Sequence, residues 1–223
     1  MSARAVTSTR RVGLVAVLAA LAATALAGCD DPAKDKSKAT ASAAAPASQA
    51  AALTPAGGVE LPFSSATGAK ISWTGSKVTG KHEGGFGDVK GTIRLVDGAP
   101  EKSSVHVEID AASITSDTER LTGHLKSPDF FDVGQFAKIS FDSTAVKPGG
   151  DKGASHTVTG NLTLHGVTKS LTFPATVQVQ GESVTVEAEF SLNRRDFGLT
   201  YPGKKDDLIR DDVVVKLSVK AKK

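Results

Sequence analysis

Two groups of polar side chains have types and spacing that could support chemistry. Arg120 and His124 are four residues apart after a helix-capping pattern at 116–119, so a helix would place them on one face. Together they could bind an anionic or carbonyl group. Arg195, within the segment 194–196, could receive a polar headgroup at the rim of the fold. It could equally belong to a structural ion-pair cluster, which is the commoner use of such groups.

The sequence lacks the usual signatures of catalysis and metal binding. It has no G-x-S-x-G, P-loop or H-E-x-x-H pattern, and the glycines that begin at Gly85 do not have the spacing of a dinucleotide fingerprint. The five histidines are scattered along the chain, whereas a metal site usually needs about three or four clustered ligands. We therefore predict no catalytic residue, no cofactor and no metal.

Cys29 is the only cysteine, so an intramolecular disulfide is impossible. It follows three basic residues and an uncharged apolar run over 12–27, which is typical of a secretory signal peptide. The run is shorter than the roughly 20 residues that span a bilayer. Its end, Leu26-Ala27-Gly28-Cys29, resembles the lipobox of bacterial lipoproteins, in which the cysteine becomes the lipidated N-terminus.

This resemblance predicts that residues 1–28 are a lipoprotein signal peptide and that Cys29 is the lipidation site. Several acyl chains would anchor the protein stably to a membrane. We expect a location in the cell envelope, facing the periplasm or the exterior. The sequence does not distinguish the inner membrane from the outer.

The charge balance excludes a nucleic-acid binder. The formal net charge is +3, from 27 Lys and Arg against 24 Asp and Glu. Arg4, Arg10 and Arg11 account for the whole excess, so the rest of the chain is neutral. A nucleic-acid binder needs a basic surface that neutralises phosphates.

Residues 29–58 are rich in alanine, serine and proline, and Leu53 is their one larger apolar residue. Such a segment buries too little apolar surface to offset the entropy of ordering it. The prolines and the lack of an apolar stripe argue against an alanine-rich helix. We predict a disordered tether over 29–58, followed by one folded domain over 59–223.

From Val59 onward, runs of apolar residues alternate with polar ones, as at 104–109, 171–180 and 184–192. This pattern is typical of antiparallel strands with one buried face. Gly181-Glu182 fits a two-residue type II′ hairpin turn. We predict about eight strands and one short helix near 117–126. Periodicity alone does not choose between a closed barrel and a sandwich.

Phenylalanine supplies nine of the eleven aromatic residues. Any one of these rings could simply fill a core, but as a set with aliphatic residues they could line an apolar ligand pocket. The candidate ligand-binding residues are Trp73, Phe86, Ile93, Val107, Ile109, Arg120, His124, Leu125, Phe130, Phe131, Phe136, Phe141, Leu164, Phe173, Phe190, Arg195 and Phe197.

Five segments resemble the YceI-like family and occur in the family's order. They are TSDTER at 115–120, HLKSPDFFDV at 124–133, ISFDST at 139–144, GNLTLHGVTK at 160–169 and RDFGL at 195–199. The resemblance implies an all-β, antiparallel eight-stranded lipocalin-like barrel with one short helix. It also implies a secreted or periplasmic protein that holds a polyisoprenoid or similar amphiphile. Leu121 departs from the family pattern, which has an acid after the arginine, and this departure removes a polar partner beside Arg120.

The leading hypothesis is a membrane-tethered carrier for a long apolar isoprenoid, such as a quinone or a prenyl lipid. One alternative is a binding module for a protein or envelope partner, with a filled barrel. An enzyme that acts on an isoprenoid lipid, with His124 as acid or base, is less favoured because no second polar partner is evident. The outer face of the barrel leaves a homodimer possible.

Overall fold

The computed structural model describes residues 31–46 and 57–223. The predicted signal peptide and the predicted lipidation site, Cys29, lie outside the described residues. No helix within the described part of the chain has the length and apolar character needed to cross a membrane.

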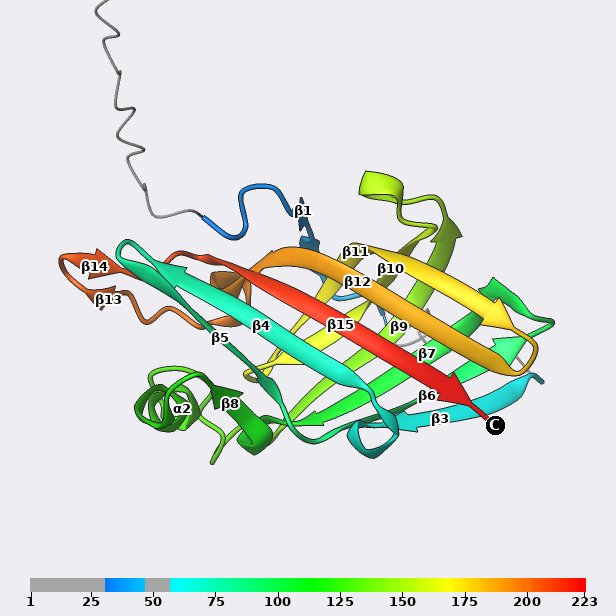
Figure 1. Ribbon diagram of the computed structural model, residues 1–223, viewed down its shortest axis with the longest axis horizontal. Coiled ribbons are helices and arrows are strands. Elements are labelled where there is room, and N and C mark those ends of the chain that lie inside the picture. The colour runs from blue at the N-terminus through cyan, green and yellow to red at the C-terminus, as the bar shows by residue number, and fades with distance from the viewer. Residues whose placement is uncertain (1–30, 47–56) are drawn as a thin grey trace, which may run out of the picture.

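One long, curled, mainly antiparallel sheet makes up most of the fold (Figure 1). Its main strands follow the order β3-β6-β7-β9-β10-β11-β12-β15-β4-β5-β8. Their bounds are β3 Val59–Ser64, β4 Lys70–Lys77, β5 Gly80–Phe86, β6 Val89–Val96, β7 Ala99–Asp110, β8 Ile114–Ser116, β9 Lys138–Pro148, β10 His156–Leu164, β11 Val167–Gln180, β12 Ser183–Asn193 and β15 Asp212–Lys222.

The smaller elements lie at the ends and edges of this sheet. They are β1 Ser37–Lys38, β2 Thr40–Ala43, the hairpin of β13 Gly203–Lys204 and β14 Asp207–Leu208, helix α2 Glu119–Lys126, and four 3₁₀ turns at Ser65–Thr67, Ala111–Ser113, Asp151–Gly153 and Arg194–Phe197. In Figure 1, α2 and β8 lie at one end of the curled sheet and the turn between β11 and β12 lies at the other.

The predicted all-β class with one short helix is confirmed for the described residues, whereas the predicted eight-stranded barrel is not confirmed. The sheet joins eleven strands in one order, and β1 and β2 add to it. Among the described strands, the two ends of that order, β3 and β8, are not paired with each other. The sheet is therefore a lipocalin-like half-barrel. The strands missed by the periodicity include β5, whose sequence GKHEGGF has no apolar alternation.

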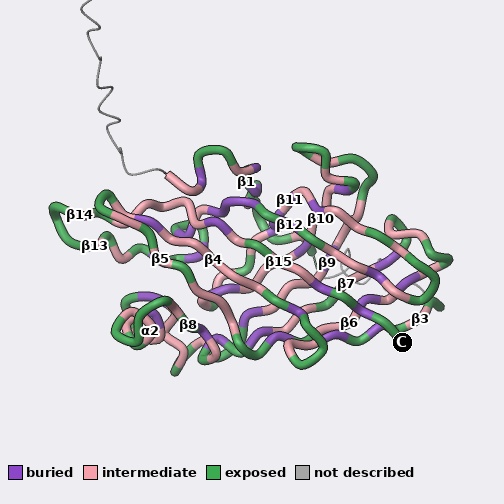
Figure 2. Tube along the Cα trace, in the orientation of Figure 1, coloured by how far each residue is buried: buried purple, intermediate pink, exposed green. Residues whose placement is uncertain are grey.

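Residue parity sends one face of each strand inward. On β6, for example, Val89, Ile93 and Leu95 are buried, while Lys90 on the opposite face is exposed. Figure 2 shows buried stretches distributed along the strands of the sheet. Gly160 shows how tightly the interior is built, since a Cβ atom there would lie 2.3 Å from the ring of Phe141. A glycine at this position lets the aromatic ring lie against the backbone.

The two-residue turn between β11 and β12 matches the prediction. Gln180 pairs with Ser183, which leaves Gly181 and Glu182 as the turn. Gly181 has a φ of 59°, and glycine adopts this left-handed conformation without steric cost.

Residues 31–46, called here the N-terminal strap, are built into the sheet, contrary to the prediction of a disordered tether over 29–58. Within the strap, β1 pairs in parallel with β12 and β2 pairs antiparallel with β11. Ala39 is buried in the main core cluster and Ala41 packs against it. The composition predicts too little buried apolar surface to order this segment. In the structure, its small side chains fit a narrow seam between β11 and β12.

Asp151 provides a pH-sensitive contact to the strap. Ser37 Oγ donates a 2.6 Å hydrogen bond to Asp151 Oδ2, and this bond holds the pKa of Asp151 below its ordinary value of 3.8. Because the folded pKa is depressed, the contact stabilises the strap above about pH 4 and is lost as the pH falls through the folded pKa.

We expect Asp151→Ala to increase amide hydrogen exchange of residues 37–43 at neutral pH. Acidification below about pH 4 should then change that exchange less in the variant than in the natural chain. The control is Asp206→Ala, because Asp206 is exposed in the β13–β14 hairpin. Unchanged strap protection in Asp151→Ala would show that this hydrogen bond does not hold the segment.

Candidate ligand-binding lumen

The inner face of the curled sheet carries apolar side chains, and the space that this face surrounds is called here the lumen. Its wall includes inward-facing side chains that are only half-buried: Val107, Phe141, Leu162, Val177, Val186, Val215 and Leu217. A protein interior packed to normal density would leave such residues buried. These residues face inward but remain partly accessible to water. Side chains therefore do not completely fill the lumen.

A small apolar cavity of about 50 Å³ lies in the lumen toward the end with the β6–β7 and β11–β12 hairpins. Its lining is aliphatic apart from two serines and a proline. The lining residues are Ile93, Leu95, Pro100, Ser103, Ser104, Val105, Val146, Val158, Val177, Val179 and Val184. A cavity with this lining can hold a hydrocarbon chain but offers few groups that would orient a polar one.

A row of aromatic rings crosses the middle of the sheet. The Phe173 ring stacks on Phe190 with a centroid distance of 4.5 Å, and its centroid lies 5.7 Å from that of Phe141. Phe173 and Phe190 are buried, whereas Phe141 is half-buried. Of these rings, Phe141 is the one open to the lumen, and the other two form its support.

The opposite end of the lumen is packed by a second apolar group, called here the α2 cluster. Its buried members are Ile114, Leu125 and Phe130, and the half-buried residues packed against them are Trp73, Phe86, Leu121, Phe131, Tyr201 and Ile209. Leu121, the departure from the family pattern, thus adds an apolar contact to this cluster. Phe86 and Phe131 meet edge to face at 6.0 Å and link the cluster to the main core.

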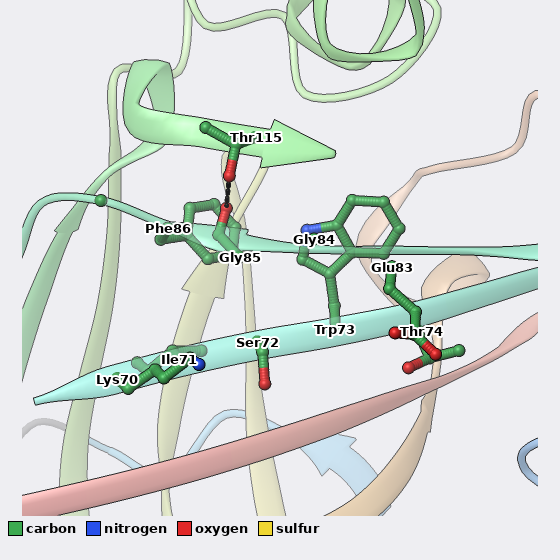
Figure 3. Close-up of a pocket in the computed structure, with 11 residues that line it drawn as sticks. Lys70, Ile71, Ser72, Trp73, Thr74, Glu83, Gly84, Gly85, Phe86 and Thr115 are labelled. Atoms are coloured by element: carbon green, nitrogen blue, oxygen red, sulfur yellow. Dashed lines mark hydrogen bonds between the residues drawn. The ribbon is translucent and has the colours of Figure 1, made fainter. Parts of the chain in front are cut away.

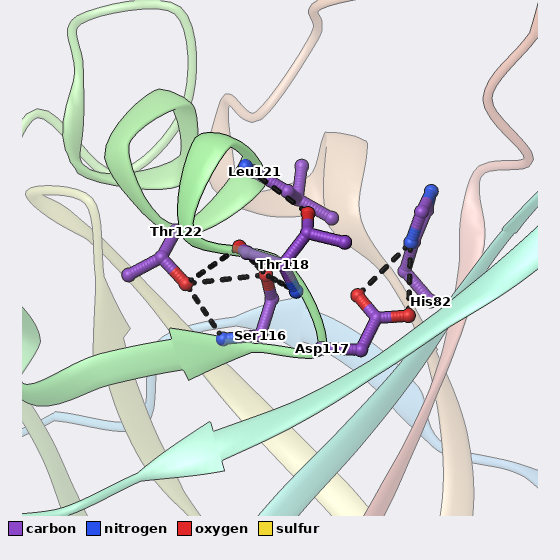
Figure 4. Close-up of polar contacts among 6 residues, drawn as sticks. All are labelled: His82, Ser116, Asp117, Thr118, Leu121 and Thr122. Carbon is purple, nitrogen blue, oxygen red and sulfur yellow. Dashed lines mark hydrogen bonds and ion pairs between the residues drawn. The ribbon is translucent and has the colours of Figure 1, made fainter.

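Helix α2 begins at Glu119, two residues later than the sequence predicts, because Thr118 is its N-cap. Thr118 Oγ1 accepts a hydrogen bond from the amide of Leu121, and the Ser116 hydroxyl donates to the Thr118 carbonyl (Figure 4). Thr122 Oγ1 accepts from the Ser116 amide, and the hydroxyl donates to the Thr118 carbonyl. These bonds fix the start of the helix against β8 and thereby set the position of the α2 cluster.

Arg120 and His124 share the helix as predicted, but their contacts do not converge on one group. His124 Nε2 lies 2.8 Å from Asp129 Oδ2, and its ring meets those of Phe130 and Tyr201 at 5.0 Å each. Arg120 is exposed and makes no ion pair within the described part of the chain. His124 is therefore a partner of Asp129 in an aromatic setting, and a joint anion site with Arg120 has no geometric support.

The two arginines after β12 have different environments. Arg194 is 4% exposed and donates to the backbone carbonyls of Leu199, Ile209 and Arg210. Burial lowers the pKa of its guanidinium, and the nearby Asp211 carboxylate opposes that effect.

Arg195, the predicted headgroup residue, lies at the surface. Its Nε donates to Asp211 Oδ1 at 2.6 Å, and Arg194 Nη2 lies 3.1 Å from the same oxygen. The two arginines and Asp211 therefore form the structural ion-pair cluster that the sequence left as one of two interpretations.

A polar pocket of about 470 Å³ lies at the β4, β5 and β8 strands (Figure 3). The Trp73 ring lies against the backbone at Gly84, where a Cβ atom would be 2.5 Å from the ring. Its indole Nε1 is covered and has no acceptor among the described residues. In the view of Figure 3, Ser72 and Thr74 point away from the Trp73 ring, so the pocket has one aromatic and one polar side.

The remaining candidates fall into the core or outside the lumen. Ile109, Leu164 and Phe197 are buried in the main core cluster. Phe136 packs edge to face on His165 with a centroid distance of 4.6 Å, away from the aromatic row. The described residues contain no group of three or more side chains that could hold a metal ion.

Sequence reasoning missed several lining residues. Val146, Val158 and Val177 line the apolar cavity, and Tyr201 and Asp129 complete the surroundings of His124. The strand parity that selected Val107 could also have selected the valines. Tyr201 follows the last recognised motif and gave no periodic signal.

Comparison with known proteins agrees with this geometry. The YceI-like domain model matches residues 64–221. A UPF0312 protein of Pseudomonas fluorescens is 39% identical over 136 residues, which cover 58% of this chain and 70% of that protein.

Two solved structures share the fold. BcnA of Burkholderia cenocepacia has a TM-score of 0.59 and 25% identity, over 69% of this chain and 96% of BcnA. A polyisoprenoid-binding domain from Saccharophagus degradans, implicated in plant cell wall breakdown, has a TM-score of 0.58 and 16% identity, over 74% and 99% of the two chains. The curled sheet and the span of the family match together show that this chain belongs to the YceI-like domain family.

Proposed function

We propose that this protein is a lipid-anchored carrier that holds a long apolar isoprenoid, such as a quinone or a prenyl lipid, in its lumen. The observation that carries the proposal is the set of inward-facing apolar side chains of the lumen wall that stay half-buried, such as Val107, Val186 and Leu217. Membership of the YceI-like family and the likeness to a polyisoprenoid-binding domain support the same ligand class. Lipidation at Cys29 would keep the lumen close to the bilayer that supplies such a ligand.

The physical basis for binding is the transfer of hydrocarbon out of water. Each buried CH₂ group contributes about 0.8 kcal/mol, so a chain of several isoprene units can bind without directed hydrogen bonds. The cavity of about 50 Å³ is smaller than the roughly 300–1,000 Å³ of ordinary ligand sites. Loading therefore requires the lining valines to separate, which a half-barrel with two unpaired ends permits more readily than a closed barrel.

We infer binding rather than catalysis. His124 is the acid or base that the sequence offers for such a reaction, and its Nε2 pairs with Asp129 Oδ2 at 2.8 Å. Its ring neighbours Phe130 and Tyr201 belong to the α2 cluster, and neither His124 nor Asp129 lines the apolar cavity.

A protein or envelope partner is the second candidate function. Val78 and Leu208 are the large apolar residues that the described surface leaves most exposed, at 52% and 50%. The Val78 amide donates to the Leu208 carbonyl, so the turn between β4 and β5 lies beside β14. Such a patch could contact a partner.

The two functions are separated by the lipid content of the purified protein. We expect residues 30–223, which retain the N-terminal strap and lack Cys29, to release a stoichiometric isoprenoid or long-chain amphiphile into organic solvent, as detected by mass spectrometry. A protein that is empty and also takes up neither added quinone nor added prenyl phosphate would contradict the carrier function. Loss of partner binding in Val78→Ser/Leu208→Ser would then support the second candidate.

A further inference from the structure

The two longest neighbouring strands separate along part of their length. β11 and β12 are paired from Gln180 and Ser183 at the turn as far as Thr176 and Glu187. Beyond this point, β2 becomes the partner of β11 at Thr172, and β1 becomes the partner of β12 at Phe190. The strands thus form a fork, and the N-terminal strap fills its wider part. Figure 1 shows β1 of the strap beside this part of the sheet.

The narrow part of the fork has no strand between its sides. On the side of β11 that faces the fork, Pro174 and Ala175 have no partner among the described strands. The same holds for Ala188 and Glu189 on the side of β12 that faces the fork. Proline lacks an amide hydrogen, so it suits a position where no sheet pairing continues.

A groove of about 510 Å³ lies at this fork. Ala175, Ala188 and Leu217 are among its lining residues, and by strand parity their side chains belong to the inner face of the sheet. The rim is charged and includes Lys36 of the strap and Glu189 of β12, which form a 2.9 Å ion pair. Apolar inner-face residues and a polar rim thus meet at one opening, the arrangement that suits an amphiphile.

The strap is held mainly by backbone pairing to β11 and β12. It covers the fork with small side chains, of which Ala33, Ser37 and Ala39 are buried, so it buries little apolar surface. Its ion pairs, such as Lys38 with Asp212 at 2.9 Å, are partly exposed, and ion pairs near the surface contribute little individually. Segments with few apolar contacts open at lower free energy than the core strands around them.

We propose that the fork is a side portal through which the apolar chain of a lipid passes into the lumen, and that the N-terminal strap is its movable edge. This inference rests on the proposed carrier function. The strap begins two residues after Cys29, and Ser37 at the fork is at most about 28 Å of extended chain from that residue. A lipid anchor at Cys29 would therefore keep the portal near the bilayer. The strap precedes the residues that match the family model, 64–221, whereas β11 and β12 lie within them.

The test locks the strap to β11. Ser42 and Ser170 are register partners, so Ser42→Cys/Ser170→Cys places two thiols within reach of a disulfide. The matched control is Gln178→Cys/Thr185→Cys, which joins β11 to β12 where they are already paired. Both proteins carry Cys29→Ser, so no third thiol is present.

Uptake is followed by quenching of Trp73, the single tryptophan, with ubiquinone that carries a farnesyl tail in phosphatidylglycerol vesicles. We expect the oxidised strap variant to load at least about tenfold more slowly, as for a closed gate, and a reductant to restore the rate. The oxidised control should load at the natural rate.

Three results would overturn the portal. Equal loading of the oxidised and reduced strap variant would show that lipid reaches the lumen by another opening, and the carrier function would stand. Equal slowing by both cross-links would assign the effect to general stiffening of the sheet. Failure of the reduced variant and of the natural chain to bind any quinone would overturn the portal and the carrier function together.

Discussion

Phenylalanine at both Val177 and Val186 should weaken quinone binding strongly while the protein stays folded. The two valines are register partners on β11 and β12, face inward, and are half-buried. Val177 also lines the apolar cavity. Two rings placed here would occupy the space that a ligand chain needs, so the affinity should fall by about tenfold or more, which corresponds to at least about 1.4 kcal/mol.

The matched control lies one residue along each strand. Gln178 and Thr185 are also register partners but face outward, so Gln178→Phe/Thr185→Phe adds the same rings outside the lumen. We expect that control to bind quinone like the natural chain, with both affinities measured by titration of Trp73 fluorescence. Equal affinity in the inward and outward variants would place the ligand outside this part of the lumen. A circular dichroism melt shows whether lost binding reflects unfolding, because overpacking alone can cost about 1–3 kcal/mol.

The fold was predictable from the sequence where alternation was strong. The run at 171–180 and the run at 184–192 predicted β11, β12 and their two-residue turn, because one face of each strand is apolar. β5 was not predictable in this way. Its Gly84 leaves room for the Trp73 ring of the neighbouring strand β4 and adds no apolar side chain to the core. The contribution of that glycine depends on a cross-strand partner, which a local pattern does not reveal.

The N-terminal strap is ordered although its composition predicts disorder. Composition alone predicts disorder for residues 31–46, and it correctly describes how little apolar surface they offer. Composition does not show that β11 and β12 separate and leave unpaired backbone groups for Ser37 and Thr40 to meet. Backbone pairing can order a segment whose side chains would not order it.

The sequence predicted the apolar character of the candidate site better than it predicted the individual residues and their contacts. Alternation places Val107, Phe141 and Ile93 on the inner face, and all three lie there. The polar candidates were less predictable, because helical spacing brings Arg120 and His124 to one helix but does not determine their contacts. Asp129, five residues after His124, takes the histidine as its partner through a turn.

Arg194 should be one of the most important polar residues for stability, and the adjacent Arg195 should contribute little. Arg194 donates through Nε to the Arg210 carbonyl at 3.1 Å, and its Nη atoms reach the carbonyls of Leu199 and Ile209. Arg194→Met would fill much of the same volume and leave these carbonyls without their donor. A buried polar group that loses its partner costs about 1–3 kcal/mol, so we expect a loss of about 3 kcal/mol in the free energy of unfolding.

Arg195→Met is the matched control, because the Arg195 side chain is 48% exposed and its ion pair is with Asp211 alone among the described acids. An exposed pair of this kind contributes about 0–1 kcal/mol. Urea denaturation at neutral pH should therefore shift the midpoint strongly for Arg194→Met and little for Arg195→Met, with the same slope for both. Equal shifts would mean that the Asp211 ion pairs, rather than the carbonyl contacts, hold this end of the sheet. Because β15 begins at Asp212, directly after Asp211, loosening this end of the sheet would also loosen the start of β15, where Asp212 holds Lys38 of the strap.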